Sequence, residues 1–499
     1  MSCRVSLVLV FLLPVVASAQ ENATPLEFQL AFSDKVAKVP FTGRVFVMLS
    51  AAEIKDLPQK PKWFNNEPLF ARDVKDWIPG QPLVIGNASL SFPMPLSKVK
   101  PGTYSIQAIM DFDLGSANCT AGPGNAYSKP VRLKIDPAKT GPIKLVIDQV
   151  IPQATVKEAE QVKFMEMPSK LLSAFHRKPM SLRAGVVLPK SFAASPEKRY
   201  PVVYEIPGFG GNHTMAHNAA ARQASDVAGI EMIHVVLDPG CRLGHHVFAD
   251  SENNGPCGQA LIAEFIPHIE KTFRGLGIPS SRFVTGHSSG GWSSLWLQVV
   301  YPDVFGGVWS TAPDSVDFRD FQKVDIYAAN ANLFTDEKGV QRPLARKKDK
   351  VTLHYKPFSD MEAVFGHGGQ LGSFEAVFSP RGPDGRPRLL WDRATGKIDP
   401  QTARTWQRYD IRLMLEQNWK TLAPKLAGKL HVYMGDEDTF YLDGATRLLK
   451  ESLAKLGSDA KVEIFPGRDH GNLLTKELRQ RIGREMADRY RKVARIGTP

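Results

Sequence analysis

The chain has 499 residues, of which 43% are hydrophobic and 23% charged, and its formal net charge is +12. These values are ordinary for a soluble globular protein and leave room for two or three domains. Because the basic residues are spread along the chain without a nucleic-acid-binding motif, we expect a solvated surface and no nucleic-acid partner. Weak attraction to an acidic polysaccharide or an anionic cell surface is the alternative.

Residues 1–19 have the pattern of a secretory signal peptide. Arg4 supplies a positive start, residues 5–16 form an apolar core, and Ala17-Ser18-Ala19 is a small-residue cleavage site. The apolar core is too short to span a membrane comfortably, and no later segment is long and apolar enough to do so. We therefore expect a soluble protein that is cleaved behind Ala19 and is secreted or periplasmic.

Export would place the remaining cysteines, Cys119, Cys241 and Cys257, in an oxidising compartment. Cys241 and Cys257 flank a polar loop, so the sequence allows either a disulfide between them or two buried thiols. No C-x-x-C pair occurs, which argues against a zinc ribbon.

Residues 20–150 are predicted to form a β domain. Short apolar runs separated by Pro/Gly-rich turns predict strands, and they lie at residues 44–49, 102–110, 131–135 and 143–147. Because no strong helical periodicity accompanies them, a small immunoglobulin-like β-sandwich is the expected fold. Nothing in this domain looks catalytic, and residues 151–166 are expected to be a connector.

From about residue 160 to residue 499, strands and helices alternate. Strands are predicted at residues 184–188, 202–206, 232–237, 283–285, 307–310, 429–434 and 461–465, and helices at residues 258–273 and 445–456. Such alternation predicts a mostly parallel sheet covered by helices on both faces. Between about 313 and 405 the regularity breaks into a Pro/Gly- and charge-rich stretch that is too long for a simple loop. We expect this stretch to be an insertion lying over the active-site face.

The most informative motif is Gly286-His287-Ser288-Ser289-Gly290, which has the form G-x-S-x-G. It follows a strand-like run at residues 282–285 and precedes a helix-like run at residues 291–300. In that context the motif makes a sharp turn that exposes a nucleophilic serine, and the helix N-terminus favours negative charge on an attacked carbonyl. Ser288 is therefore the candidate nucleophile, with an ordinary helix-start serine as the alternative.

A serine hydroxyl needs a base to remove its proton and a third group to orient that base. An acid and then a histidine are expected after the serine in the chain. Asp438 follows the strand-like run 429–434, and His470 follows the run 461–465. Both residues lie where strands of a parallel sheet end, which is where such sheets bind ligands. We expect His470 to be the base and Asp438 the acid, with Asp436 as the alternative acid.

Two backbone amides are expected to hold the oxyanion of the reaction. The strand-like run 202–206 leads into Pro207-Gly208-Phe209-Gly210-Gly211, whose glycines allow a backbone N–H to approach a substrate closely. We assign one donor to the amide of Phe209 and the other to the amide of Ser289.

Further candidates for contact with the substrate are Gly208, Gly210, His287 and His246. For His287 the alternative is packing beneath the turn, and for His246 it is ordinary packing in a loop. His213 and His217 have the i, i+4 spacing of metal ligands on a helix, but no third ligand accompanies them. We therefore predict no metal and no organic cofactor.

Residues from about 180 to 480 resemble the Putative esterase family of α/β-hydrolases, which includes esterase D, feruloyl and acetylxylan esterases, and the enterochelin esterases with their N-terminal β-sandwich. The matching stretches are residues 207–211 (PGFGG), 286–291 (GHSSGG), 435–442 (GDEDTFYL) and 466–471 (PGRDHG). The resemblance implies an α/β-hydrolase fold with Ser288, Asp438 and His470 as the triad. About 150 residues separate Ser288 from Asp438, more than in the compact members, so the insertion leaves the substrate class open.

Together these features predict an exported serine carboxylesterase that acts through an acyl-enzyme on a small-molecule or carbohydrate ester. The resemblance implies acyl groups linked to polysaccharides as one substrate class. An acyltransferase or a peptidase on the same fold is an alternative. A second alternative is a non-catalytic carbohydrate- or surface-binding protein, in which Trp63, Phe64 and Trp77 would supply exposed aromatic rings.

Overall fold

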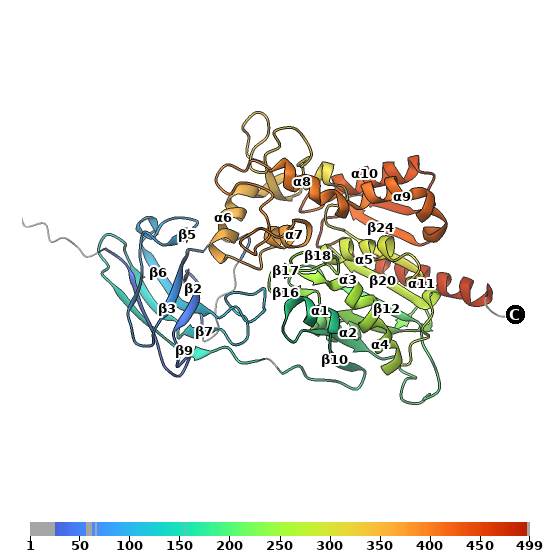
Figure 1. Cartoon of the computed structure of the whole chain (residues 1–499), viewed down its shortest axis with the longest axis horizontal. Helices are drawn as coiled ribbons and strands as arrows, with labels where there is room; N and C mark the ends of the chain where they lie inside the picture. The colour runs from blue at the N-terminus through green and yellow to red at the C-terminus, as the bar shows by residue number, and fades with distance from the viewer. Residues whose placement is uncertain (1–24, 56–61, 65–66, 154, 497–499) are drawn as a thin grey trace, which may run out of the picture.

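The computed structural model describes residues 25–55, 62–64, 67–153 and 155–496, so the expected signal peptide lies outside the described residues. Figure 1 shows an N-terminal β domain beside a larger α/β domain, with helix α6 (Tyr355–Phe365) between the two. Within the described residues, no helix is both long and apolar enough to cross a bilayer.

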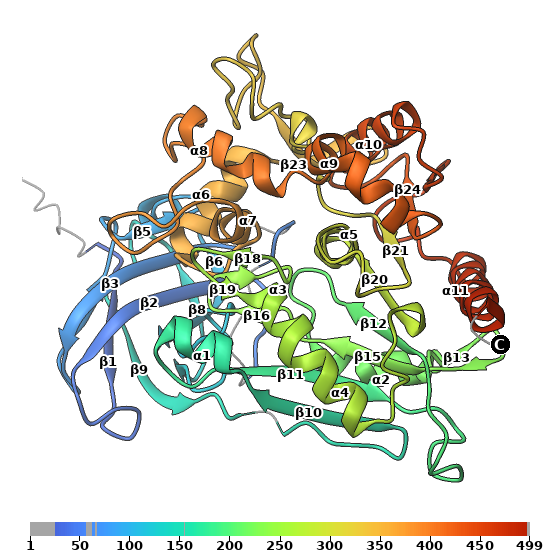
Figure 2. The same cartoon turned by 45° about the vertical axis from the view of Figure 1, so that its right-hand side comes forward.

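The described part of the N-terminal domain forms a nine-stranded sheet with the order β4-β1-β9-β7-β6-β2-β3-β5, and β8 pairs with β6 beside that path. The strands are β1 (Phe28–Phe32), β2 (Phe41–Ser50), β3 (Leu69–Trp77), β4 (Leu83–Ile85), β5 (Leu90–Phe92), β6 (Gly102–Asp111), β7 (Ala126–Ser128), β8 (Val131–Ile135) and β9 (Ile143–Val150). Figure 2 shows how this sheet curls. It encloses a core that includes Phe28, Phe70 and Trp77.

The predicted all-β domain is confirmed, but its strands are joined in one curled sheet and not in the two separate sheets of a sandwich. The join lies on one edge of β6, which pairs with β8 along Gly102–Ile106 and with β7 at Ile109 and Met110. The long strand β6 therefore pairs with two strands on the same edge, and the sheet remains continuous as it curls around its core.

The larger domain is built on an eight-stranded sheet of the described residues, with the order β10-β11-β15-β12-β20-β21-β24-β25. The strands are β10 (Val162–Pro168), β11 (Ser181–Val187), β12 (Val202–Ile206), β15 (Ile233–Leu237), β20 (Arg282–His287), β21 (Gly307–Thr311), β24 (Leu430–Gly435) and β25 (Lys461–Phe465). All neighbours from β15 to β25 are parallel, whereas β10 and β11 run antiparallel at one edge. The predicted mostly parallel sheet is confirmed.

Strand β10 was not expected, because the sequence predicts a connector at residues 151–166. Val162 is fully buried, but Lys163 and the following residues of this edge strand are only half-buried or exposed. A strand at the edge of a sheet needs no continuous apolar run. Pairing with β11 holds β10 in the sheet, and backbone hydrogen bonds of this kind do not require a particular residue pattern.

Helices cover both faces of this sheet, as predicted. On one face pack α3 (Cys257–Ala260), α4 (Ile266–Thr272), α5 (Ser289–Val300) and α9 (Ile411–Leu426), and on the other α2 (Ala216–Ala221) and α11 (Lys476–Ile496). Adjacent residues of β12 face opposite layers: Val202 packs on the side of α5 and α9, and Val203 packs on the side of α11. The alternation of side chains along a strand therefore places an apolar layer on each face.

The insertion expected at residues 313–405 packs against the N-terminal domain. It contains the hairpin β22 (Pro343–Lys347) and β23 (Lys350–His354), followed by α6, α7 (Gln370–Phe378) and α8 (Pro400–Trp406). Phe46 of β2 and Phe365 of α6 lie in one hydrophobic cluster, with ring centroids 6.4 Å apart. The two domains therefore share one hydrophobic cluster at their interface, beside the separate core of the β domain.

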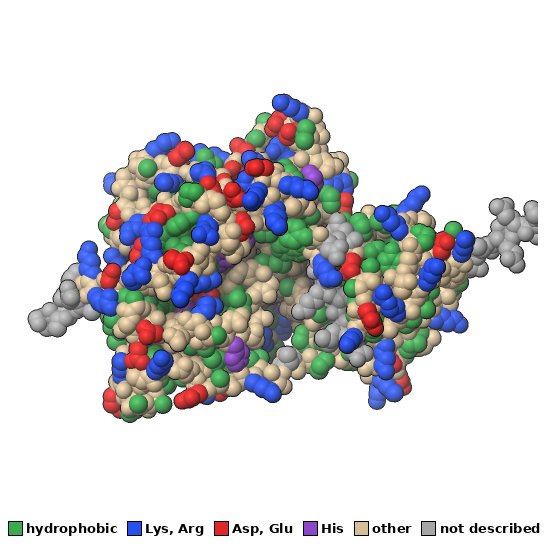
Figure 3. All heavy atoms as spheres, turned by 180° about the vertical axis from the view of Figure 1, so that it is seen from behind, with side chains coloured by type: hydrophobic (Ala, Val, Ile, Leu, Met, Phe, Trp, Pro, Cys, Tyr) green, Lys and Arg blue, Asp and Glu red, His purple; other side chains and the backbone are tan. Residues whose placement is uncertain are grey.

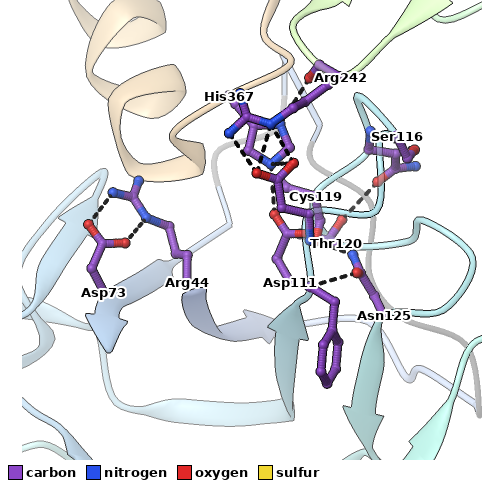
Figure 4. Close-up of polar contacts among 12 residues, drawn as sticks. Arg44, Asp73, Asp111, Ser116, Cys119, Thr120, Asn125, Arg242 and His367 are labelled. Carbon is purple, nitrogen blue, oxygen red and sulfur yellow. Dashed lines mark hydrogen bonds and ion pairs between the residues drawn. The ribbon is translucent and has the colours of Figure 1, made fainter. Parts of the chain in front are cut away.

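Polar contacts also join the N-terminal domain to the insertion (Figure 4). Arg44 pairs with Asp73 and donates to the carbonyl oxygens of residues 363 and 364 at the end of α6, at 3.0 and 2.9 Å. His367, in the turn before α7, pairs through Nε2 with Asp111 of β6 at 2.8 Å. These contacts tie the insertion to two strands of the N-terminal sheet.

Charged residues are distributed over the surface that Figure 3 shows. Lys and Arg side chains lie interspersed with Asp and Glu over both domains and do not gather in one patch. That face is hollowed between the two domains, with hydrophobic side chains beside the hollow.

Candidate active site

Ser288 occupies the sharp turn between β20 and α5. Its backbone has φ 60° and ψ −126°, a conformation that non-glycine residues rarely adopt. A Cβ atom at Gly286 or Gly290 would overlap with neighbouring backbone, so only glycine fits on either side. The turn holds the serine at the N-terminus of a buried helix, as the G-x-S-x-G motif predicts.

His470 and Asp438 come together at the ends of adjacent strands. His470 Nδ1 lies 2.7 Å from Asp438 Oδ2, and Asp438 is fully buried. Its Oδ1 accepts hydrogen bonds from the amides of Phe440 (2.9 Å) and Leu442 (3.3 Å). Asp436 instead accepts a hydrogen bond from the amide of Gly467 at 2.7 Å, so Asp438 is the carboxylate that faces the histidine.

The electrostatics of this pair favour an ionised carboxylate. Burial opposes the charge of Asp438, but the charge of His470 and its hydrogen bond outweigh burial, so the pKa of Asp438 is lower than usual. Burial likewise disfavours the charged form of His470, but the charge and hydrogen bond of Asp438 raise the pKa of His470 above its ordinary value. The pair is thus suited to hold a proton transferred from a neighbouring hydroxyl.

The loop after β12 lies directly against the serine turn. A Cβ atom on Gly208 would stand 3.0 Å from His287 O and 3.2 Å from Ser288 Cβ. His245 Nε2 lies 2.9 Å from the carbonyl oxygen of Pro207 and anchors the start of the loop. The amides of Phe209 and Ser289, the predicted oxyanion donors, therefore belong to two segments that meet beside Ser288.

A cavity of about 290 Å³ opens beside these residues. It is lined by Trp63, Gly208, Phe209, His287, Ser288, Asp314, Gln322, Leu344, Phe358, Gln370, Leu371, Phe374, Phe440 and His470. The lining residues from Asp314 to Phe374 belong to the stretch 313–405 that the sequence predicts to be an insertion. Trp63 comes from the N-terminal domain.

The other predicted contact residues divide into two groups. Gly208 and His287 line the cavity, whereas Gly210 and His246 are not among the described residues that do so. His287 hydrogen-bonds with Thr311 Oγ1 at 3.1 Å, and burial lowers its pKa to about 3. His246 is buried against Phe248, with ring centroids 4.5 Å apart, so the alternative of loop packing describes it.

The cysteines and histidines that suggested a disulfide or a metal site form neither of them within the described residues. Cys119, Cys241 and Cys257 are free thiols, so Cys241 and Cys257 are not bridged. His213 pairs with Asp238 at 2.7 Å. Among the described residues, no group of three or more His, Cys, Asp or Glu side chains is placed to hold a metal ion.

Trp63, Phe64 and Trp77, the rings that the alternative of a carbohydrate-binding protein would use, are not exposed together. Trp77 is buried in the β-domain core, Trp63 is half-buried in the cavity wall, and Phe64 is exposed. The three rings therefore do not form one exposed binding surface.

Sequence reasoning missed Asp314, and it named Trp63 only as a possible exposed ring and not as part of the cavity wall. Asp314 follows the carboxyl end of β21, so the strand-end rule that located Asp438 also applies to it. Trp63 left no comparable signal, because it reaches the cavity from a loop of the other domain.

The chain matches the family model described as "Putative esterase" over residues 178–470. No curated protein matches it. Among solved structures, it is similar to a ferulic acid esterase (17% identity, 66% of this chain and 98% of that chain covered, TM-score 0.41). It is also similar to an S-formylglutathione hydrolase from Agrobacterium tumefaciens (14% identity, 67% and 98% covered, TM-score 0.40). Because the family match spans more than half of the chain, the protein belongs to this esterase family of α/β-hydrolases, whose members are serine hydrolases that act on carboxylic esters.

Proposed function

We propose that the protein is an exported serine carboxylesterase in which Ser288, His470 and Asp438 act as the catalytic triad. The observation that carries the proposal is the 2.7 Å hydrogen bond between His470 and Asp438, formed beside the cavity that Ser288 also lines. Export is proposed from the residue pattern of positions 1–19.

The reaction follows from the roles of the five residues. His470 removes the proton of Ser288, whose Oγ attacks the ester carbonyl carbon, and the amides of Phe209 and Ser289 hold the oxyanion. The alcohol leaves with a proton from His470, and water then hydrolyses the acyl-enzyme by the same steps. Asp438 keeps the imidazole in the required tautomer and supports its positive charge.

The substrate we propose is an acyl ester on an exported or extracellular carbohydrate. The apolar, aromatic lining of the cavity is suited to bury an acyl group, and the alcohol portion would extend toward solvent. Export supports a substrate outside the cytoplasm.

Hydrolysis of short p-nitrophenyl esters, with fluorophosphonate labelling alongside, tests this function. We expect Ser288→Ala to abolish both turnover and labelling. The matched control is Ser294→Ala on the same helix, because the hydroxyl of Ser294 is bonded to Gly291 O at 2.9 Å within α5. A folded wild-type protein that neither hydrolyses the esters nor takes the label would refute the proposal and favour a non-catalytic binding role.

A further inference from the structure

One buried carboxyl group faces the cavity and has no part in the proposed mechanism. Asp314 is 6% exposed, and its Oδ2 accepts a hydrogen bond from Ser289 Oγ at 2.6 Å. Its backbone amide donates to Ser288 O at 3.3 Å, and Ser288 lines the same cavity. The carboxyl group of Asp314 therefore lies against the serine turn, in the cavity of the proposed nucleophile.

The charge of His470 acts on Asp314, but within the described chain no lysine or arginine of the cavity pairs with that carboxyl group. No lysine or arginine lines the cavity among the residues that the structure describes. Burial raises the pKa of Asp314 to about 6, although the hydrogen bond from Ser289 and the charge of His470 oppose the rise. At pH 7 the cavity therefore holds a negative charge next to the reaction centre.

Gln370 of α7 extends the same polar surface. Its Nε2 lies 3.3 Å from Ser289 Oγ and 3.5 Å from Asp314 Oδ2. Its Oε1 is buried and has no hydrogen-bond partner within the described part of the chain. An acceptor in that state is costly unless a ligand supplies a donor.

Aromatic rings form the rest of the cavity wall. They are Trp63, Phe209, Phe358, Phe374 and Phe440. The faces of such rings attract cations in a desolvated site. A carboxylate, an unpaired amide oxygen and aromatic walls together complement a primary ammonium group, which carries a positive charge and three N–H donors.

We infer that Asp314 and Gln370 form an ammonium-binding subsite, and that the preferred acyl group carries an amino group on its α-carbon. We place the amino group on the α-carbon because Asp314 bonds to Ser289 Oγ and to Ser288 O, so a cation bound to its carboxyl group is held close to the residue that attacks the carbonyl carbon. The inference rests on the proposed function, since it identifies the acyl group that Ser288 would attack.

The charge balance of the reaction supports the same assignment. Attack by Ser288 on a neutral ester would build an oxyanion close to the carboxylate of Asp314, and two like charges in a buried site repel each other. An ammonium group on the substrate neutralises Asp314 before the oxyanion forms. The subsite would therefore favour the charged acyl group in the transition state as well as in binding.

A matched pair of small esters tests the inference. Glycine methyl ester and methyl propanoate are close in size, but the first carries an ammonium group, largely protonated at pH 7, where the second carries a methyl group. The wild-type protein, Asp314→Asn and Asp303→Asn would be compared by kcat/KM on both esters. Asp303 is an exposed acid, so its variant makes the same change of charge outside the cavity.

We expect Asp314→Asn to lower the ratio of kcat/KM for glycine methyl ester over methyl propanoate by about 10- to 100-fold, the usual effect of a hydrogen-bonded charge. Asp303→Asn should leave the ratio as in the wild type. Comparing one ratio between variants cancels the different intrinsic reactivities of the two esters. An equal loss on both esters, with an unchanged ratio, would mean that Asp314 only positions Ser289 and would overturn the inference.

Binding to Ser288→Ala provides a second measurement, because it needs neither turnover nor a folded Asp314 variant. Calorimetric titration with glycine methyl ester should saturate, whereas methyl propanoate should bind more weakly. Equal binding of the two esters would overturn the inference. If the wild-type protein hydrolyses neither ester but Ser288→Ala still prefers glycine methyl ester, the subsite stands and the proposed esterase function fails.

Discussion

Trp63 of the N-terminal domain lies edge-on to Phe358 of the insertion, with ring centroids 5.1 Å apart and ring planes at 86°. The same indole lies 5.8 Å from Phe209 and 6.1 Å from Phe440, measured between ring centroids. All four rings line the cavity beside Ser288. The β domain therefore supplies one wall of the candidate active site.

Replacing Trp63 by alanine should weaken substrate binding more than catalysis. The change removes one apolar wall without touching the triad, so we expect KM to rise about tenfold, with a smaller change in kcat. Steady-state kinetics on a p-nitrophenyl ester would measure both. Phe64→Ala is the control, because Phe64 is 56% exposed and does not line the cavity. An unchanged KM in Trp63→Ala would show that the β domain does not contact the substrate.

Asp438→Asn should retain the fold and lose most of the activity. An asparagine can occupy the same space, but it cannot support the charge of His470 or keep the imidazole in the same tautomer. We expect kcat to fall by about 10³- to 10⁴-fold. Asp436→Asn should have a much smaller effect, because Asp436 bonds to the Gly467 amide and not to His470. Equal losses in the two variants would contradict the assignment of Asp438.

The pH dependence of activity should report the raised pKa of His470. In the proposed mechanism this residue must be neutral to accept the proton of Ser288, so kcat/KM should rise with pH, with a midpoint above the ordinary histidine value of about 6.5. Burial alone would lower the midpoint, and the charge of Asp438 raises it. In Asp438→Asn the midpoint should therefore move to lower pH. A pH profile of the residual activity would check this, and an unmoved midpoint would contradict it.

Gly208→Ala should impair catalysis without a large loss of stability. The added methyl group would meet Ser288 Cβ at 3.2 Å and His287 O at 3.0 Å, so the oxyanion loop must shift by a few tenths of an ångström. A displaced donor stabilises the transition state less, and we expect kcat to fall by about 10- to 100-fold. Thermal unfolding should change little. A large fall in the unfolding temperature would instead indicate a structural role for this glycine.

The fold could be predicted from the sequence where local pattern determines structure. The central strands of the α/β domain, such as β12 and β24, are largely apolar because helices cover both of their faces, although Glu205 interrupts β12 and His431 interrupts β24. The edge strand β10 lacks an apolar run of this kind, since Lys163 and Glu166 point toward solvent. Local pattern could not show that β6 pairs with two strands on one edge, because pairing depends on residues far apart in the chain.

The same limit applies to the candidate site. Ser288, Asp438 and His470 each follow a strand, so motif and chain order select them from the sequence. In the structure His470 bonds to Asp438 and lines the same cavity as Ser288. His246 was predicted to line the cavity, but it packs against Phe248, and its neighbour His245 contacts Pro207 O. A loop without regular periodicity does not reveal which neighbours each of two adjacent side chains contacts. Trp63 could not be placed at all, because its position depends on how two domains pack.

The domain interface should make stability depend on pH through His367. Burial lowers the pKa of His367, but its hydrogen bond to Asp111 and the charges of Asp111 and Asp113 outweigh burial, so the pKa is raised. A group with a raised pKa in the folded state stabilises fully below its unfolded pKa, about 6.5 for histidine, and loses that contribution as pH rises through the folded pKa. The stabilisation from His367 should therefore be larger near pH 6 than near pH 8.

His367→Gln would test this contribution, because glutamine keeps a hydrogen-bonding side chain but cannot become charged. We expect the fall in unfolding temperature, relative to the wild type, to be larger at about pH 6 than at about pH 8. His268→Gln is the control, since His268 is exposed on α4. Because His367 stands in the turn before α7, which carries the cavity residues Gln370 and Phe374, loss of this contact should also raise KM. An equal destabilisation at both pH values would show that the charge of His367 does not hold the two domains together.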